Sequence, residues 1–213
     1  VHVVGDTIVD SFTYTTMIGG QTKTPTISVR LEEQHDYVGG AGVVAKHLSA
    51  AGAKVVFSTV LGDDPRKDFV LSDLAEAGVD VRAIVDGTRR TTNKNAVICE
   101  NYRLLKIDTL DNRTISESIV QKLCTAIRDT PADAIVFSDF RHGIFNRATI
   151  PVLSAAIKNG MLKVADSQVA SRWGNICEFR GFDLVTPNER EARFALADQD
   201  SVVRPLAQKL FKQ

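Results

Sequence analysis

The second half of the chain alternates short apolar runs with amphipathic segments, and this alternation limits the possible folds more than any other feature. The apolar runs cover residues 133–139, 162–166 and 182–188. The amphipathic segments cover residues 147–159, 189–197 and 201–212. Runs of the first kind are typical of buried strands, and segments of the second kind of helices. Strands separated by helices run parallel, so this half predicts a doubly wound, mainly parallel α/β sheet.

The first half adds more core elements and a second kind of strand. Residues 1–5 and 54–62 have the composition of buried strands, and residues 41–51, 65–78 and 116–129 that of helices. Short turns separate the strands predicted at 79–85, 95–100 and 102–108, so we expect this group to be antiparallel.

The most polar strands fit poorly in a buried parallel sheet, and they predict a separate small sheet. They lie in segments 24–38 and 92–108. We expect a β-sheet lid, built from about residues 12–38 and 92–108, that covers one end of the core and excludes water from a site there.

Charge and hydropathy exclude several classes of function. Lys plus Arg number 26 and Asp plus Glu number 26, so the chain lacks the basic excess of a nucleic-acid-binding protein or a polybasic membrane anchor. No apolar run reaches the roughly 20 residues that span a bilayer. The three cysteines are far apart in sequence, and we expect them to be reduced, buried thiols in a cytoplasmic protein.

Three glycines, Gly39, Gly40 and Gly42, precede the helix predicted at 41–51. Glycines at such a point let another group approach the backbone closely. One interpretation is a dinucleotide site, because Gly40, Gly42 and Ala45 match G-x-G-x-x-A. That fingerprint should directly follow the first strand of the sheet, whereas here more than thirty residues intervene, so we disfavour it.

Four other segments of the chain help to interpret the three glycines, and all five occur in a fixed order. The five segments are VVGDTIVDSF at the start, GGAGVVAKHLSAAGA after Val38, the lid strand between them, IVFSDF at 135–140 and LVTPNEREA at 184–192. Together they resemble the ribokinase-like, PfkB-type carbohydrate kinases, and within them the heptose 7-phosphate kinases. The resemblance covers essentially all 213 residues. It implies ATP and Mg²⁺ as cofactors and a sugar or sugar phosphate as substrate.

The resemblance also implies residues on the sugar side of a site. Asp10, the second Asp of the opening motif, would accept hydrogen bonds from two sugar hydroxyls, and it follows a buried strand at the end where α/β proteins bind ligands. Gly39 and Gly40 would let backbone N–H groups approach the sugar. Lys106 and Asp139 are further candidates for substrate contacts. Each of these residues has a plainer alternative. The alternatives are a turn or capping residue for the two aspartates, a tight turn for the two glycines and a solvated lid residue for Lys106.

The T-P-N-x-x-E turn implies the nucleotide side. Asn188 and Glu191 would act around Mg²⁺ and the ATP phosphates, with Glu191 reaching the metal through water. Asp166, which ends a strand at the same edge, is a further candidate there. The alternative for Glu191 is an exposed acid in the first turn of a helix, stabilised by the helix dipole.

Three departures from the family pattern stand out. Val43 occupies the position of the Asn that follows the glycines, and Asp166-Ser167-Gln168 replaces D-P-K. The late G-A-G-D motif, which supplies the general base and an anion hole, is absent from the sequence. We therefore expect the general base to lie beyond Gln213. We expect this chain, a core truncated at its C-terminal end, to be inactive alone.

The resulting expectation is a carbohydrate kinase that phosphorylates a sugar or sugar phosphate, with the C1 hydroxyl of heptose 7-phosphate as the specific prediction. A homodimer formed through the lid strands would cover their polar edges. Two alternatives stay open: a non-catalytic sugar-phosphate-binding or degenerate kinase domain of a larger protein, and a nucleoside or vitamin kinase of the same fold.

Overall fold

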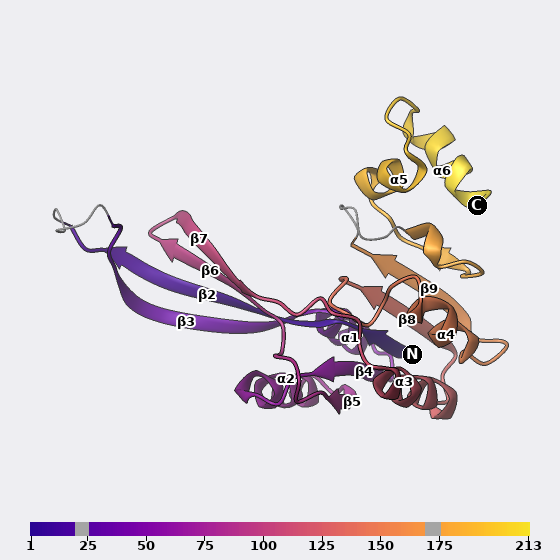
Figure 1. The fold of residues 1–213 in the computed structure, drawn as a ribbon, viewed down its shortest axis with the longest axis horizontal. Coiled ribbons are helices and arrows are strands. Elements are labelled where there is room, and N and C mark those ends of the chain that lie inside the picture. The colour runs from indigo at the N-terminus through magenta and orange to yellow at the C-terminus, as the bar shows by residue number, and fades with distance from the viewer. Residues whose placement is uncertain (20–25, 169–175) are drawn as a thin grey trace.

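The computed structural model describes residues 1–19, 26–168 and 176–213, and its strands form two sheets (Figure 1). The larger sheet is parallel, with the strand order β10-β9-β8-β1-β4-β5. Its strands are β1 (His2–Gly5), β4 (Val56–Leu61), β5 (Asp80–Val85), β8 (Ala134–Asp139), β9 (Leu162–Ser167) and β10 (Leu184–Val185). The predicted doubly wound α/β fold with a separate small sheet is confirmed.

Helices cover both faces of the large sheet. Successive residues of its central strand point to opposite sides, so neighbouring residues contact different helices. Val3 joins a cluster with residues of α1 (Ala41–Ala50) and α2 (Pro65–Glu76). Val4 joins a second cluster with α3 (Glu117–Asp129) and α4 (Thr149–Ala155). The chain continues through the short 3₁₀ helix η1 (Ile176–Glu178) to α5 (Glu189–Leu196) and α6 (Val203–Phe211), which contact each other.

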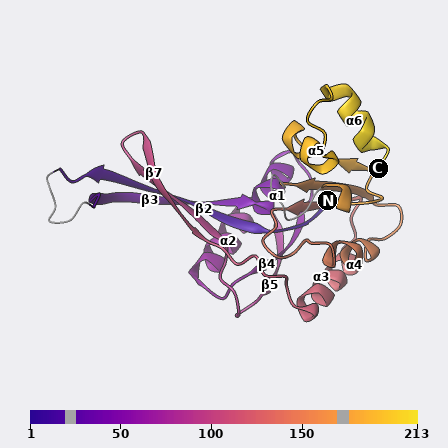
Figure 2. The ribbon, with the colours of Figure 1, turned by 45° about the horizontal axis from the view of Figure 1, so that its top comes forward.

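The smaller sheet has the order β3-β2-β6-β7 and extends away from the core as a long ribbon (Figure 2). Its strands are β2 (Thr7–Met17), β3 (Val29–Gly40), β6 (Asn93–Cys99) and β7 (Tyr102–Thr109). We call this sheet the lid. The pairs β2–β3 and β6–β7 are antiparallel, whereas β2 and β6 are parallel. Residues 20–25 of the predicted lid segment 12–38 lie outside the described residues, as do residues 169–175 of the chain.

One strand prediction is wrong. Residues 79–85 were expected in the antiparallel group, but β5 pairs parallel with β4 at the edge of the large sheet. The reason is that α2 lies between β4 and β5 and provides a crossover connection, which returns the chain in the same direction. Gly39 and Gly40 end the lid strand β3, whereas a dinucleotide fingerprint would directly follow the first strand of the large sheet.

His2 makes the stability of the core sensitive to acid. Its ring is buried in β1 with Nε2 2.8 Å from Ser58 Oγ, and burial, followed by the charge of Arg82, lowers its pKa from 6.5 to about 4. The unfolded chain therefore takes up a proton near pH 6.5 that the folded chain resists until about pH 4. Above pH 6.5, His2 makes its full contribution to the free energy of unfolding. That contribution, on the order of 3 kcal/mol, is lost as the pH falls from 6.5 to about 4.

We expect His2→Gln, which cannot titrate, to show a smaller loss of unfolding free energy between pH 7 and pH 4.5 than the parent chain. Urea unfolding at both pH values measures it. Other buried groups titrate in the same interval in both proteins, so the difference between the two slopes isolates His2. Equal slopes would contradict the assignment.

Candidate active site

Charged residues line one face of the lid where it joins the core. In the register of the lid, Asp10 of β2 pairs with Lys94 of β6, and Lys94 pairs with Asp108 of β7. Directly paired residues share a face, so these three side chains form a row across the sheet. Lys106, two residues before Asp108, lies on the same face and forms an ion pair with it at 3.3 Å.

The two glycines at the end of β3 make room for atoms of this chain. A Cβ on Gly39 would lie 2.1 Å from Asp10 Oδ2, so the Asp10 carboxylate occupies the space above Gly39. Gly40 has φ +60°, and a Cβ there would lie 2.4 Å from the carbonyl oxygen of Asp6. The structure thus brings together Asp10, Gly39, Gly40 and Lys106, four of the residues predicted for the sugar side.

Asp10 and Lys94 face each other without a direct partner. Among the described residues, neither the carboxylate of Asp10 nor the ammonium of Lys94 has a hydrogen bond or an ion pair. Partial burial raises the pKa of Asp10, against the opposing effect of Lys94 and Lys106. Burial, and then the charge of Lys106, lowers the pKa of Lys94. An acid and a base that are partly desolvated and unpaired are arranged to bind a ligand with complementary groups.

Lys94 was not among the residues predicted from the sequence. The stretch Asn93-Lys94-Asn95-Ala96 carries no motif, and only the strand register shows that Lys94 shares a face with Asp10. A period-2 reading of β6 places Lys94 on the same face as Ala96, but it does not identify β2 as the neighbouring strand.

Asp6 fixes the loop that follows β8 against this face. It is almost fully buried, and its carboxylate accepts hydrogen bonds from the backbone N–H groups of Phe140, His142 and Ile144 at 3.1, 3.2 and 3.3 Å. Burial raises the pKa of Asp6, whereas these three N–H groups lower it. Its own carbonyl accepts from Ala41 N–H, the first residue of α1, at 2.9 Å. Asp6 therefore joins the start of the lid to α1 and to the β8 loop.

Asp139, a predicted substrate contact, has partners within the protein. The carboxylate is fully buried and accepts from Arg141 N–H and Ser167 Oγ, each at 2.8 Å, and Arg141 Nε also lies 2.8 Å away. Burial raises the pKa of Asp139 to about 7, against the lowering effect of Arg141. Arg141 continues to Glu178 of η1 at 2.8 Å. These contacts hold the edge of the sheet together, and direct contact of Asp139 with a substrate stays a prediction.

The residues predicted for the nucleotide side gather at the ends of β9 and β10. Asp166 accepts a hydrogen bond from Thr186 Oγ1 at 2.7 Å, which ties β9 to the T-P-N turn. Asn188 and Glu191 form a reciprocal capping box at the start of α5, in which each side chain accepts from the other's backbone N–H at 2.9 Å. Glu191 is buried and not the exposed first-turn acid of the alternative interpretation.

Direct metal binding finds little support in these groups. The parts of the chain that the structure describes contain no cluster of three or more His, Cys, Asp or Glu side chains that could hold a metal ion. The capping box occupies one oxygen of Glu191. Contact of Glu191 with Mg²⁺ through water stays a prediction. Within the same ranges, no helix is long and apolar enough to cross a membrane.

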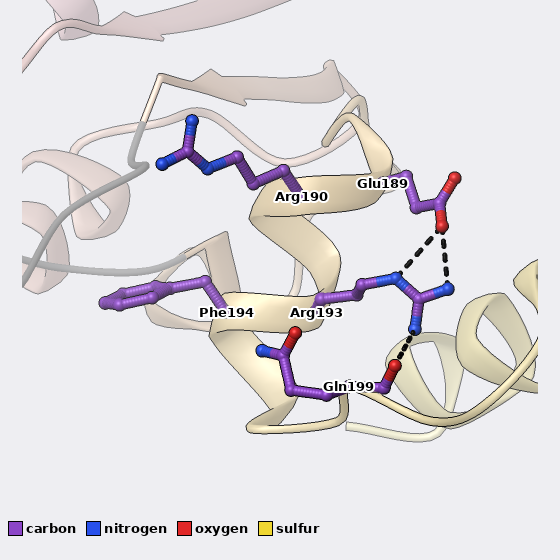
Figure 3. Close-up of a pocket in the computed structure, with 5 residues that line it drawn as sticks. All are labelled: Glu189, Arg190, Arg193, Phe194 and Gln199. Carbon is purple, nitrogen blue, oxygen red and sulfur yellow. Dashed lines mark hydrogen bonds and ion pairs between the residues drawn. The ribbon is translucent and has the colours of Figure 1, made fainter.

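A hollow of about 430 Å³ lies along α5, next to the capping box (Figure 3). Arg193 is held there by Glu189 at 2.7 Å and by the Gln199 carbonyl at 3.2 Å. Figure 3 shows Arg190 and Phe194 pointing to the other side of the helix. Internal partners neutralise Arg193, whereas Arg190, which also lines the hollow, has no ion pair among the described residues.

Comparison with known proteins agrees with the two-sheet architecture. The family model described as pfkB family carbohydrate kinase matches residues 1–213. The chain belongs to this family of carbohydrate kinases. The predicted recognition is thereby confirmed at the level of the family.

Curated and solved relatives of this pfkB kinase chain agree with the match. It is 31% identical over 211 residues to the bifunctional protein HldE of Rhodopseudomonas palustris strain TIE-1, covering 93% of this chain and 42% of the relative. The chain thus spans less than half of that protein. Phosphofructokinase-2 from Escherichia coli, in a tetrameric inhibited form, has the same fold with a TM-score of 0.76 at 19% identity, covering 99% of this chain and 69% of that one. The ribokinase of Arabidopsis thaliana, solved with ribose and ATP, gives a TM-score of 0.69 at 15% identity, covering 99% and 67%.

Proposed function

We propose that this pfkB kinase chain belongs to an enzyme that transfers the γ-phosphoryl group of ATP to a hydroxyl of a sugar phosphate in the cytoplasm. The specific substrate that we propose is heptose 7-phosphate, phosphorylated at C1. The observation that carries the proposal is that Asp10 and Lys94 lie on neighbouring strands of the lid face, beside Gly39, and that neither side chain has a hydrogen bond or ion pair among the described residues. The similarity to HldE supports the choice of sugar.

The charges of the lid face suit such a substrate. The carboxylate of Asp10 accepts hydrogen bonds from two neighbouring hydroxyls, and the ammonium of Lys94 binds an anionic group. Lys106 adds positive charge, although Asp108 partly neutralises it. Val43, in place of the family's Asn, removes one amide from this site, so Lys94 and Asp10 contribute more of the recognition.

The nucleotide side of the proposal rests on the turn before α5. Asn188, Glu191 and Asp166 would lie along the ATP phosphates, and Mg²⁺, when bound, would neutralise phosphate charge there. The capping box keeps Glu191 in place, so its contact with the ion would pass through water. Phosphoryl transfer depends on positioning and charge stabilisation, and these residues would contribute both on the nucleotide side.

A homodimer formed through the lid is part of the proposal. Leu31, Leu105 and Ile107 are each more than half exposed. Their partners on the neighbouring strands point away from the face that holds Asp10. Paired residues share a face, so these three side chains also lie on the face of the lid opposite Asp10. We expect the charge-introducing change Leu105→Glu to shift the protein toward monomer in sedimentation velocity. Lys122→Glu on α3 serves as the control, and an unchanged sedimentation coefficient for Leu105→Glu would remove the dimer from the proposal.

ADP release by the full-length protein tests the function directly. We expect release with ATP, Mg²⁺ and heptose 7-phosphate to exceed release with ribose, a nucleoside or a vitamin alcohol. Lys94→Gln should raise KM for the sugar phosphate by about 10- to 100-fold, because one charge-assisted hydrogen bond is lost. Lys122→Gln, an exposed lysine on α3, provides the matched control. No ADP release with any sugar phosphate would contradict the proposal and favour a binding or degenerate domain.

A further inference from the structure

His142 has a place in the fold that neither the family motifs nor the proposed reaction uses. It lies in the loop after β8, and its backbone N–H donates to the buried carboxylate of Asp6 at 3.2 Å. Asp6 also immediately precedes the lid strand β2. The ring is therefore positioned at the junction of the lid and the core.

The hydrogen bonds of the ring determine which nitrogen carries the proton. Nδ1 lies 2.8 Å from Asn112 Oδ1, which is a carbonyl oxygen and can only accept. Nδ1 is thus the donor. Burial, and then the nearby charge of Lys94, lowers the pKa of His142 to about 4, so the ring is neutral at pH 7. In this tautomer Nε2 has a lone pair and accepts hydrogen bonds.

Nε2 has no donor to accept from. It is shielded from solvent and has no hydrogen-bond partner among the described residues. Leaving a buried acceptor unsatisfied costs about 1–3 kcal/mol, so native proteins retain such groups mainly where a ligand or a water completes them. The charged groups that act on the ring are Lys94 and Asp108, both on the lid face that holds Asp10.

We infer that His142 is a specificity-determining residue of the sugar site, whose Nε2 accepts a hydrogen bond from one substrate hydroxyl. The inference rests on the proposed function and deepens it. Asp10 and His142 are then two acceptors that face different hydroxyls, while Lys94 binds the anionic group. The substrate class is a polyhydroxylated anionic sugar with a hydroxyl beside its Asp10-bound pair.

Two substitutions separate the ring nitrogens. In His142→Asn, the side-chain amide can still donate to Asn112 from near the Nδ1 position, but nothing reaches the position of Nε2. In His142→Gln, the longer side chain carries an acceptor to the Nε2 position. His47→Asn on the exposed side of α1 is the matched control, and thermal melting verifies that each variant is folded.

The experiment is a double-mutant cycle between protein and ligand, with the full-length protein, heptose 7-phosphate and its monodeoxy analogues in calorimetric titrations. We expect one analogue to bind wild type about 10-fold more weakly than the parent sugar, and to bind His142→Asn as well as the parent sugar does. His142→Gln should retain most of this coupling.

Two negative outcomes are distinguishable. If heptose 7-phosphate binds but every analogue loses the same factor in wild type and in His142→Asn, the inference is overturned and the proposed function stands. If neither heptose 7-phosphate nor any analogue binds wild type, the proposed function fails and the inference fails with it.

Discussion

Replacing Asp10 by Asn is expected to weaken binding of the sugar substrate by about 100-fold or more, because hydrogen bonds to a charged acceptor each contribute about 1.5–3 kcal/mol. The side chain has no partner among the described residues, so its loss leaves no protein group unsatisfied. Stability should consequently change little. Calorimetric titration with heptose 7-phosphate, together with urea unfolding, measures both quantities.

Asp36→Asn is the matched control, because Asp36 belongs to the same pair of strands but faces the other side of the lid, where it accepts from Ser11 Oγ at 2.5 Å. We expect Gly39→Ala to reproduce the Asp10 effect, since the new methyl group would displace the Asp10 carboxylate. Equal affinity in wild type and Asp10→Asn would show that this carboxylate does not hold the substrate.

Replacing Gly40 by Ala should destabilise the fold by about 3 kcal/mol, because two costs combine. A non-glycine residue at φ +60° costs about 1–2 kcal/mol. The added Cβ would also lie 2.4 Å from the Asp6 carbonyl oxygen, a backbone atom that cannot move aside as a side chain does, and such overpacking costs about 1–3 kcal/mol. The midpoint of urea unfolding, at constant m-value, reports the loss.

Gly52 separates the two costs. It has φ +91°, but a Cβ there would meet nothing within 4 Å. Gly52→Ala therefore includes the backbone term alone, and it should destabilise less than Gly40→Ala. If the two variants unfold at the same urea concentration, close contact with Asp6 is not what requires glycine at position 40.

The sequence supports the fold better than it supports the site. Alternating apolar runs and amphipathic helices predict the parallel core because burial on both faces demands such runs, and polar strands predict the lid for the opposite reason. The pattern failed at β5, where the short connection to β6 suggested a hairpin. Only the crossover through α2 shows that β5 belongs to the large sheet.

The charged face depends on information that a one-dimensional pattern lacks. Asp10 was predicted from a motif, but Lys94 meets it only through the register between β2 and β6, whose residues are more than eighty positions apart. His142 faces the same region because Asp6 orients its loop. Motifs therefore predict single residues of this site, whereas strand pairing and loop anchoring determine which residues act together.

The contacts of Asp6 also set an order of assembly during synthesis. The hairpin of β2 and β3 pairs residues that are near in sequence, so it can form early, whereas the three N–H groups that satisfy the Asp6 carboxylate lie 134 to 138 positions later. Until residue 144 has left the ribosome, this carboxylate lacks one or more of the three N–H donors that satisfy it in the folded chain. The ligand face is therefore completed late, after β8 has joined β1, and nascent chains that stop before that point contain the glycines and Asp10 but not the assembled site.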